Sequence, residues 1–302
     1  MEGADGATVS SMKSTTSSER CQIRLDRLAL TGGGSSKVPR NIRGFKMSRD
    51  FRPRAQGKIA TYGRVRTFCS TSNSARLSLQ YQRVMPFLAP WRCMLIADDD
   101  DGITPDQVES VIVQCSSHKL TLAEFAVDFA EGGIVDRDFV LRHGKFGKTQ
   151  RRKDRGGSGN LRYGSRQSPK LVRAYRKETL GCFRVELEIH SALLRKYRTS
   201  SGFELGRLAQ KLVPAHIQFV GFRWEELQAY LVKKFGQQEG DKIFGEARKR
   251  ADSSLQAATR FLSGRGVPNV HRFVSPLRLN LRLQKAIKCW AKTFSVSEEL
   301  CG

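Results

Sequence analysis

Two kinds of hydrophobic pattern divide this chain. Between about residues 76 and 190, apolar residues alternate with polar ones, which is typical of strands with one buried face. Beyond residue 200, apolar residues recur at three- and four-residue spacing, which is typical of amphipathic helices. Strands followed by helices predict an α+β chain with a mainly antiparallel sheet, flanking helices and a helical C-terminal part. No internal repeat is visible in the sequence.

Individual elements are expected at definite places. A helix is expected over about 105–116, because Thr104 can cap it and Pro105 suits its first position. The segment "KLTLAEFAVDFAEGG" alternates as a strand, and two further strands are expected near 169–177 and 182–190. The intervening "HGKFGKTQRRKDRGGSGN" lacks a sustained apolar period, so it predicts a glycine-rich basic loop.

Composition divides the chain into three parts. Residues 1–75 are rich in Ser, Thr, Gly and Arg, so we expect a basic low-complexity arm that is disordered in isolation. Residues 76–200 hold the alternating segments and are expected to form a catalytic sheet domain. Residues 201–302 hold the helical segments and are expected to pack on that domain.

The net charge narrows the class of partner. The 302 residues carry a formal charge of +24, which favours a polyanion, above all nucleic acid, over a small-molecule substrate. No apolar run approaches the roughly 18 residues of a membrane-spanning helix, and the N-terminus lacks the apolar core of a secretory signal. We therefore expect a cytoplasmic protein without a membrane partner. The seven cysteines form no CxxC pair, so reduced thiols are expected.

Basic residues concentrate in one stretch. From Arg142 to Lys177 there are thirteen Lys or Arg and one acid, Asp154. Such a run is either a solvated surface or a groove that follows phosphates, and the strands expected within it favour the groove. The sequence "RHGKFGKT" ends like a phosphate-binding loop, but Arg142 stands where that loop requires a glycine, which argues against an NTPase. The candidates for DNA contact are Arg151, Arg152, Lys153, Arg166, Lys170, Arg173 and Lys177.

Carboxylates are expected near a tyrosine on a basic strand face. Alternation places Tyr175 with Arg173 and Lys177 on one face of its strand. Acidic residues on the polar faces of the other strands could supply oxygen ligands for Mg²⁺ or Mn²⁺; the alternative is that they form ion pairs with Arg and Lys. The five histidines never lie two or three residues apart, so the sequence has no strand-borne histidine pair for a metal. The candidate carboxylates are Glu124, Asp128, Glu186 and Glu188.

The stretch "LRYGSRQSPKLVRAYRKETLGCFRVELEIHSALLRKY" resembles the core of the trans-acting rolling-circle replication initiators of plasmids and filamentous phages, the replication initiation factor family. Members carry a "YxGSRxS" turn, an arginine-tyrosine strand often ending "YDK", an "RxElEl" strand and a helix. Their upstream acidic strand "RiDlavD" is similar to "LAEFAVDF". The resemblance covers about residues 119–200. The chain departs from the pattern at Leu122, Glu124 and Arg176, where members have Arg, Asp and Asp.

The resemblance implies a DNA-nicking and strand-transfer endonuclease that initiates replication. Tyr175 would be the nucleophile that attacks a phosphodiester of origin DNA, single-stranded or in a hairpin, and leaves a free 3′ hydroxyl. Asp128 and Glu186 would be the first ligands of Mg or Mn, with Glu124 and Glu188 as second choices. A host helicase and a second copy of the chain are open as further partners.

Two other classes of protein stay open on the sequence alone. A non-catalytic DNA-binding protein or repressor would use the same basic surface without a nucleophile or a metal. A structural RNA-binding protein of the ribosomal sort would explain the basic arm, but has little need of four carboxylates on neighbouring strand faces. A buried Tyr175, or carboxylates that are all held in ion pairs, would favour a binding protein.

Overall fold

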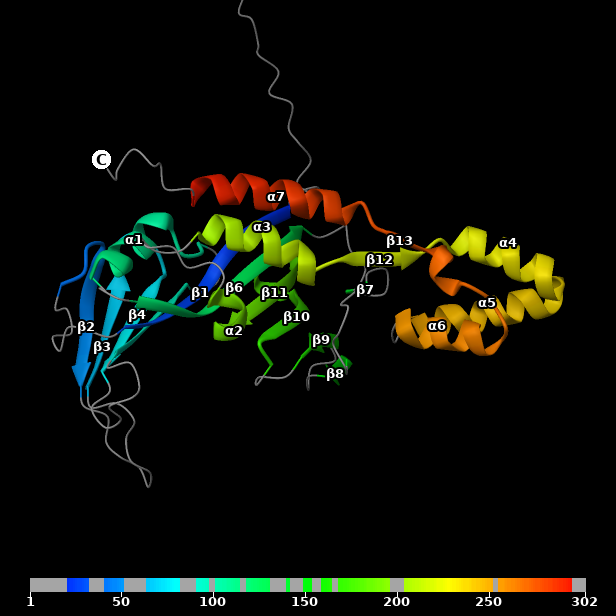
Figure 1. Ribbon diagram of the computed structural model, residues 1–302, viewed down its shortest axis with the longest axis horizontal. Helices are drawn as coiled ribbons and strands as arrows, with labels where there is room; N and C mark the ends of the chain where they lie inside the picture. Colours follow the sequence, from blue (N-terminus) through cyan, green and yellow to red (C-terminus); the bar gives the residue numbers. More distant parts are fainter. Residues whose placement is uncertain are drawn as a thin grey trace, which may run out of the picture.

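One antiparallel sheet forms the body of the protein (Figure 1). The computed structural model describes residues 21–32, 41–51, 64–81, 91–97, 101–114, 118–130, 140–141, 149–153, 159–164, 168–195, 204–251 and 255–294. Within them the sheet has ten strands in the order β2-β3-β4-β5-β1-β6-β11-β10-β9-β8, and each strand is antiparallel to its neighbours. The strands are β1 Cys21–Gly32, β2 Phe45–Phe51, β3 Arg64–Ser70, β4 Arg76–Tyr81, β5 Trp91–Ile96, β6 His118–Ala130, β8 Thr149–Lys153, β9 Gly159–Tyr163, β10 Lys170–Lys177 and β11 Cys182–His190.

Helices and a second, three-stranded sheet complete the fold. The small sheet has the order β13-β12-β7. Its strands are β7 Val140–Leu141, β12 Phe219–Phe222 and β13 Val274–Pro276. The helices are α1 Pro105–Gln114, α2 Ser191–Leu194, α3 Leu205–His216, α4 Trp224–Phe235, α5 Gln237–Ala251, α6 Leu255–Gly264 and α7 Leu279–Thr293.

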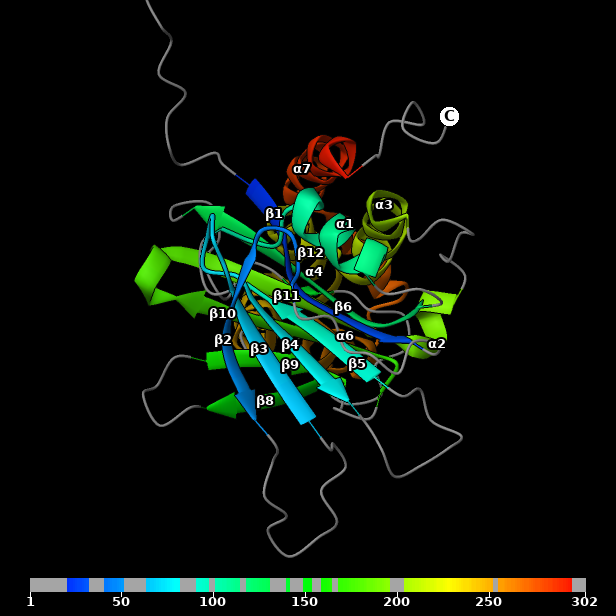
Figure 2. The same ribbon diagram turned by 90° about the vertical axis from the view of Figure 1, so that its left-hand side faces the viewer.

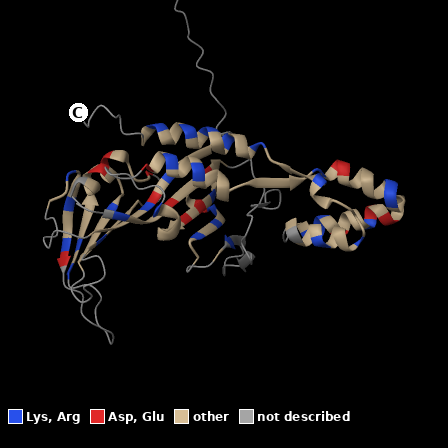
Figure 3. Cartoon of the chain, in the orientation of Figure 1, with Lys and Arg blue, Asp and Glu red and all other residues tan. Residues whose placement is uncertain are grey.

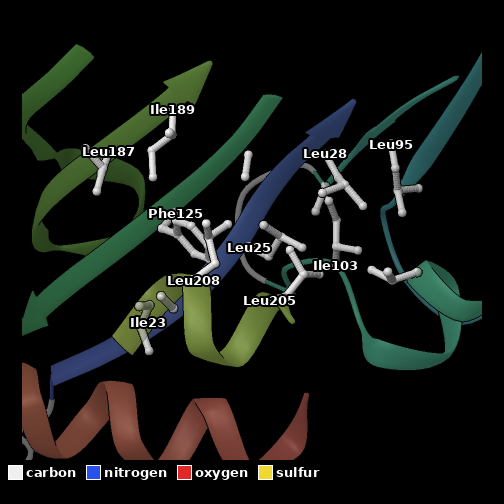
Figure 4. Close-up of a cluster of buried hydrophobic side chains, with 14 of the residues drawn as sticks. Ile23, Leu25, Leu28, Leu95, Ile103, Phe125, Leu187, Ile189, Leu205 and Leu208 are labelled. Carbon is white, nitrogen blue, oxygen red and sulfur yellow. The ribbon is translucent and has the colours of Figure 1, made fainter. Parts of the chain in front are cut away.

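The main core lies between one face of the large sheet and the helices α1, α3 and α7, which lie on the same side of it (Figures 1 and 2). Alternation along β6 directs Phe125 and Val127 into this core, and both are fully buried. Leu205 and Leu208 of α3 pack against the same cluster, as Figure 4 shows. Burial of each such side chain contributes about 1.5 to 3 kcal/mol, so this face fixes the strand register and leaves the opposite face for polar residues.

The helices α4, α5 and α6 form a second body beside the sheet (Figure 1). They bury a separate hydrophobic cluster, which includes Leu227, Leu231, Ile243 and Leu262. The strands β12 and β13 lead into and out of this body, because Phe222 pairs with Val274. The helical C-terminal part is therefore divided: α3 and α7 pack on the sheet, whereas α4–α6 have their own core.

The structure confirms the α+β class, the helix near 105–116 and the strands near 169–177 and 182–190. It corrects two other expectations. The segment 1–75, expected as a disordered arm, supplies β1, β2 and β3, and β1 lies at the centre of the sheet. The expected loop after residue 142 contains β8, whose backbone pairs with β9 even though its sequence is strongly basic.

Two further expectations concern the environment of the chain. Among the cysteines of the described residues, Cys21, Cys69, Cys93, Cys182 and Cys289, no disulfide is formed. Within the same residues, no helix is both long enough and apolar enough to cross a membrane.

Candidate active site

Four central strands bring the candidate residues to one face of the sheet, opposite the helices. Antiparallel pairing sets Arg173 of β10 across from Glu186 of β11, and Glu188 of β11 across from Glu124 of β6. On the other side of β6, Arg27 of β1 lies across from Glu124. Directly paired residues point to the same side of a sheet, so residues far apart in sequence share one polar face. Figure 3 shows acidic and basic positions side by side at the middle of the sheet.

Tyr175 forms a short hydrogen bond within this face. Its hydroxyl donates to Glu186 Oε1 at 2.5 Å. The side chain is half-buried, and burial together with the Glu186 carboxylate raises the pKa of Tyr175 above its ordinary value. The resting side chain is therefore a neutral phenol whose proton already points at a carboxylate.

Arg173 lies among three of the four candidate carboxylates. Its Nη2 donates a hydrogen bond to Glu124 Oε1 and lies 4.0 Å from Glu188 Oε2. Its Nε lies 2.8 Å from Glu186 Oε2. Glu188 has a second neighbour, because His190 Nε2 lies 2.8 Å from its Oε1. A single guanidinium thus holds the point on which Glu124, Glu186 and Glu188 converge.

The fourth candidate carboxylate, Asp128, belongs to a different set of contacts. Arg184 donates to both of its oxygens, Nε to Oδ1 at 2.6 Å and Nη2 to Oδ2 at 2.9 Å, and Arg24 donates to Oδ2 as well. The Nη1 of Arg184 also reaches Asp26 Oδ2 at 3.4 Å. Asp128 is buried, and its bidentate ion pair with Arg184 is among the stronger charge-assisted contacts. Together, the contacts of Asp128 fix β1, β6 and β11 to one another on their polar face.

Burial shapes the charge of this face. Desolvation raises the pKa of Glu124 to about 7 and that of Asp26 to about 6, although neighbouring arginines act against both shifts. Near neutral pH these two carboxylates are partly protonated, which reduces the repulsion among the acids. The acids of the face are Asp26, Glu124, Asp128, Glu186 and Glu188, and its arginines are Arg24, Arg27, Arg173 and Arg184.

The fit of a divalent cation can be tested against these contacts. The oxygens Glu124 Oε2 and Glu186 Oε2 are buried and accept no hydrogen bond from the described residues, and carboxylate oxygens are the donors that Mg²⁺ and Mn²⁺ prefer. As the side chains stand, however, no group of three or more His, Cys, Asp or Glu in the described part of the chain is arranged to hold a metal ion. The reason is Arg173, whose positive charge already lies where Glu124, Glu186 and Glu188 converge.

The candidates for DNA contact have different surroundings. Arg173 belongs to the acidic cluster, and Lys177 shares the polar face and acts electrostatically on Asp26. Lys170 lies 3.3 Å from His216 Nδ1 of α3. Arg166 lies outside the described residues, and the side chains of Arg151, Arg152 and Lys153 on β8 also lie outside them.

Sequence reasoning missed the contribution of β1. Arg24 and Arg27 reach Asp128 and Glu124 from this strand, and Asp26 reaches Arg184. Arg184 lies within the strand expected near 182–190, but no role was assigned to it from the sequence. The signal in "CQIRLDRLAL" is an alternation that a β-bulge interrupts between Leu25 and Arg27.

Comparison with solved structures finds a distant similarity. No protein-family model matches the chain, and no curated protein matches it. A solved structure described as "Structure of Rolling Circle Replication Initiator Protein from Geobacillus stearothermophilus" is 15% identical, with a TM-score of 0.41 over 66% of this chain and 87% of that chain. At this identity and TM-score, the similarity by itself decides neither the topology nor the activity of this protein.

Proposed function

We propose that this protein initiates rolling-circle replication by nicking and rejoining origin DNA through a bond between Tyr175 and a DNA phosphate. The observation that carries the proposal is the short hydrogen bond from the Tyr175 hydroxyl to Glu186, beside the Arg173 guanidinium on a polar sheet face. The resemblance of residues 119–200 to replication initiators supports the same residue. Positively charged DNA-binding candidates around it support a polyanionic substrate.

The contacts of these side chains assign each of them a role in the nicking step. Glu186 Oε1 accepts the phenolic proton as the Tyr175 oxygen attacks phosphorus. The bond between phosphorus and the 3′ oxygen of the preceding nucleotide breaks, and that oxygen takes up a proton from solvent water to become a free 3′ hydroxyl. The 5′ phosphate stays on Tyr175, so the energy of the broken ester is kept in the new one. Rejoining is the reverse step and needs no nucleotide cofactor.

Arg173 is the side chain that can stabilise the charge that develops on the phosphoryl oxygens. Its guanidinium lies next to Glu186, which holds the tyrosine, and 35% of its side chain is exposed. A phosphate that reaches Tyr175 would therefore meet a positive charge beside the nucleophile. In exchange for its carboxylate partners, Arg173 would bind the scissile phosphate.

We include a divalent cation, Mg²⁺ or Mn²⁺, as a cofactor. The Arg173 guanidinium would have to move before the cation could bind. Once this guanidinium turns to a DNA phosphate, Glu124, Glu186 and Glu188 would be the carboxylates left to hold the cation. Asp128 is less suited, because Arg184 and Arg24 occupy both of its oxygens. When bound, such a cation supplies further positive charge at the phosphoryl oxygens.

The proposal is tested with supercoiled DNA that carries the region upstream of the coding sequence. The wild type, with Mn²⁺ added, should give nicked circles and a protein-linked 5′ end. Tyr175→Phe keeps the ring but lacks the attacking oxygen, so it should bind this DNA with near-normal affinity and form no adduct. Omission of Mn²⁺ with a chelator present should abolish nicking by the wild type.

The nearest other tyrosine provides the control. Tyr163 lies on β9, where its backbone pairs with Val172 of β10, so Tyr163→Phe should still form the adduct. An adduct made by Tyr175→Phe would show that the nucleophile is wrongly assigned. Recruitment of a host helicase and formation of a homodimer stay predictions that this assay does not address.

A non-catalytic DNA-binding protein or repressor is the second candidate. The observation that favours it is that each of the four candidate carboxylates already has an arginine neighbour, so the face is neutralised without a metal. The half-buried position of Tyr175 also favours a binding protein. Tight binding of the upstream DNA by the wild type, with no nick and no adduct in Mn²⁺ or Mg²⁺, would establish this alternative.

A further inference from the structure

The ten-stranded sheet consists of two halves with the same connectivity, a repeat that the sequence does not reveal. In each half, a long central strand is followed by a strand at the outer edge, and the chain then returns strand by strand to pair with the long strand. The first half is β1 with β2–β5, and the second is β6 with β8–β11. A helix on the core face completes each half, α1 in the first and α3 in the second (Figure 2).

The two halves meet at the antiparallel pair of β1 and β6. An antiparallel pair at the centre relates the halves by an approximate two-fold axis perpendicular to the sheet. Such an axis keeps each face of the sheet on its own side. The polar face of β1, β5 and β4 is therefore the counterpart of the catalytic face on β6, β11 and β10.

The first half lacks the chemistry of the second. When Ala29 of β1 is matched with Ala126 of β6, the strand pairings place Gln80 at the position of Tyr175. The same match places Met94 at the position of Glu186, and Arg27 at that of Glu124. No phenol or carboxylate stands at these three positions, so the first half cannot be a second nicking site.

The first half instead presents positive charge on this face. Register places one or two basic side chains on the face from each of β2, β4 and β5, and among the described residues of β2–β5 no Asp or Glu shares it. The acid of these strands, Asp50, points to the opposite face, where Arg64 and Arg66 hold it. Figure 3 shows basic positions along these strands at the left-hand end of the sheet. The basic residues are Lys46, Arg49, Arg76 and Arg92, of which the first three are exposed and the last is half-buried.

We propose that the first half is a copy of the catalytic half that has lost the reaction and binds the single-stranded DNA beside the nick. The inference rests on the proposed function for its polyanion. Register places Arg76 in the same row as Arg27, through Ile96 of β5, and places Arg92 across from Thr31 of β1. A single strand of DNA that runs obliquely from Tyr175 across β11, β6 and β1 therefore reaches Arg27 first, and Arg76 and Arg92 beyond it. Arg27 joins this basic face to the catalytic centre, because its Nη1 lies 3.4 Å from Glu124 Oε2.

Uncharged side chains fill the positions between these cations, and they include the apolar Met94 and Ile96. Thr67, Ser78 and Gln80 lie on the same face, and each can donate a hydrogen bond to a phosphate oxygen. Such a face carries contacts to the sugar-phosphate backbone and no particular means of reading bases. The basic face should therefore bind single strands of any sequence.

The experiment compares two charge-matched double variants. Arg76→Gln with Arg92→Gln removes two cations from the proposed DNA path, whereas Lys242→Gln with Lys249→Gln removes two exposed cations of α5. The probe is a fluorescein-labelled single-stranded oligonucleotide of mixed sequence, read by anisotropy at several NaCl concentrations. Loss of two phosphate contacts should weaken binding roughly 10- to 30-fold at 0.1 M salt and make the salt dependence shallower by about 1.4, since each single-strand contact contributes about 0.7.

The control variant should bind within about twofold of the wild type, as expected for cations away from the DNA. Arg76→Lys with Arg92→Lys should restore binding, which separates charge from a folding defect. Equal affinities and equal salt slopes for the two Gln variants would overturn the inference. The proposed function is tested by a different measurement. If the wild type forms no covalent adduct, the nicking reaction is wrong, and the anisotropy measurement still decides whether the basic face binds single-stranded DNA.

Discussion

Glu124 is a buried carboxyl on the polar sheet face, and its charge should be visible in the stability of the protein. Its pKa is raised from 4.5 to about 7, chiefly by desolvation. The folded protein therefore holds a proton that the unfolded chain releases near its ordinary pKa, and this advantage is lost as pH rises through about 7. Between pH 5 and 7.5, the free energy of unfolding of the wild type should fall relative to that of Glu124→Gln, by on the order of 3 kcal/mol.

Urea unfolding at several pH values would measure this difference. Asp26, with a pKa raised to about 6, should contribute a fall at lower pH in both proteins. Glu226→Gln, which removes an exposed carboxylate of α4, is the control for a simple loss of charge and should follow the wild type. If the free energies of unfolding of the wild type and Glu124→Gln depend on pH in the same way, the Glu124 carboxyl ionises with an ordinary pKa.

Residue faces were predictable where alternation was regular. The period of two placed Glu124 and Asp128 on one side of β6 and Phe125 on the other, as the structure has them. The partners of these carboxylates were not predictable, because a guanidinium from β1 or β10 reaches them only after residues 104 or 49 positions apart in sequence come together across the sheet. The sequence therefore predicted candidate metal ligands where the structure has arginine ion pairs.

At the scale of elements, the approach of α3 to α7 depends on one glycine. A Cβ on Gly206 would lie 2.8 Å from the carbonyl oxygen of Ala291. Gly206→Ala should therefore push these helices apart and lower the free energy of unfolding by about 1 to 3 kcal/mol. Gly245→Ala on α5 is the matched control, since its Cβ would meet no atom within 4 Å.

Gly245→Ala should raise the free energy of unfolding by up to about 1 kcal/mol, because alanine favours helix over glycine. Chemical denaturation followed by circular dichroism would measure both changes. Stabilisation by both substitutions would contradict the close helix contact.

The elements themselves were predictable to different degrees. The long regular patterns of α1, β6, β10 and β11 were sufficient, since each has one clearly apolar face. β1 escaped prediction because its bulge at Asp26 sets Leu25 and Leu28 three residues apart on the same core face, which breaks the period of two. Its arginine-rich polar face also made the segment look like part of a disordered arm.

For the whole molecule, the order of strands in space was beyond the reach of local patterns. Pairing of β1 with β6 and of β11 with β6 joins distant segments, and only their combined burial selects it. The repeat of topology is hidden for the same reason: the two halves share their path through space, while the candidate carboxylates lie on the polar face of the second half only. A pattern of apolar positions says which face is buried and leaves the neighbours of each strand undetermined.

Because the molecule has two separate cores, the large sheet should fold without the α4–α6 body. The body α4–α6 is attached through β12 and β13, where Arg223 N donates to Phe273 O at 2.7 Å. Residues 224–272 can therefore be replaced by Asn-Gly, a two-residue turn that suits an antiparallel pair. Because Arg173, Tyr175 and Glu186 lie on the large sheet, the shortened protein should still fold and form the covalent adduct with a single-stranded oligonucleotide. Circular dichroism and denaturing gels would measure folding and the adduct, and a shortened chain that cannot fold would show that the α4–α6 body is part of the sheet's own folding unit.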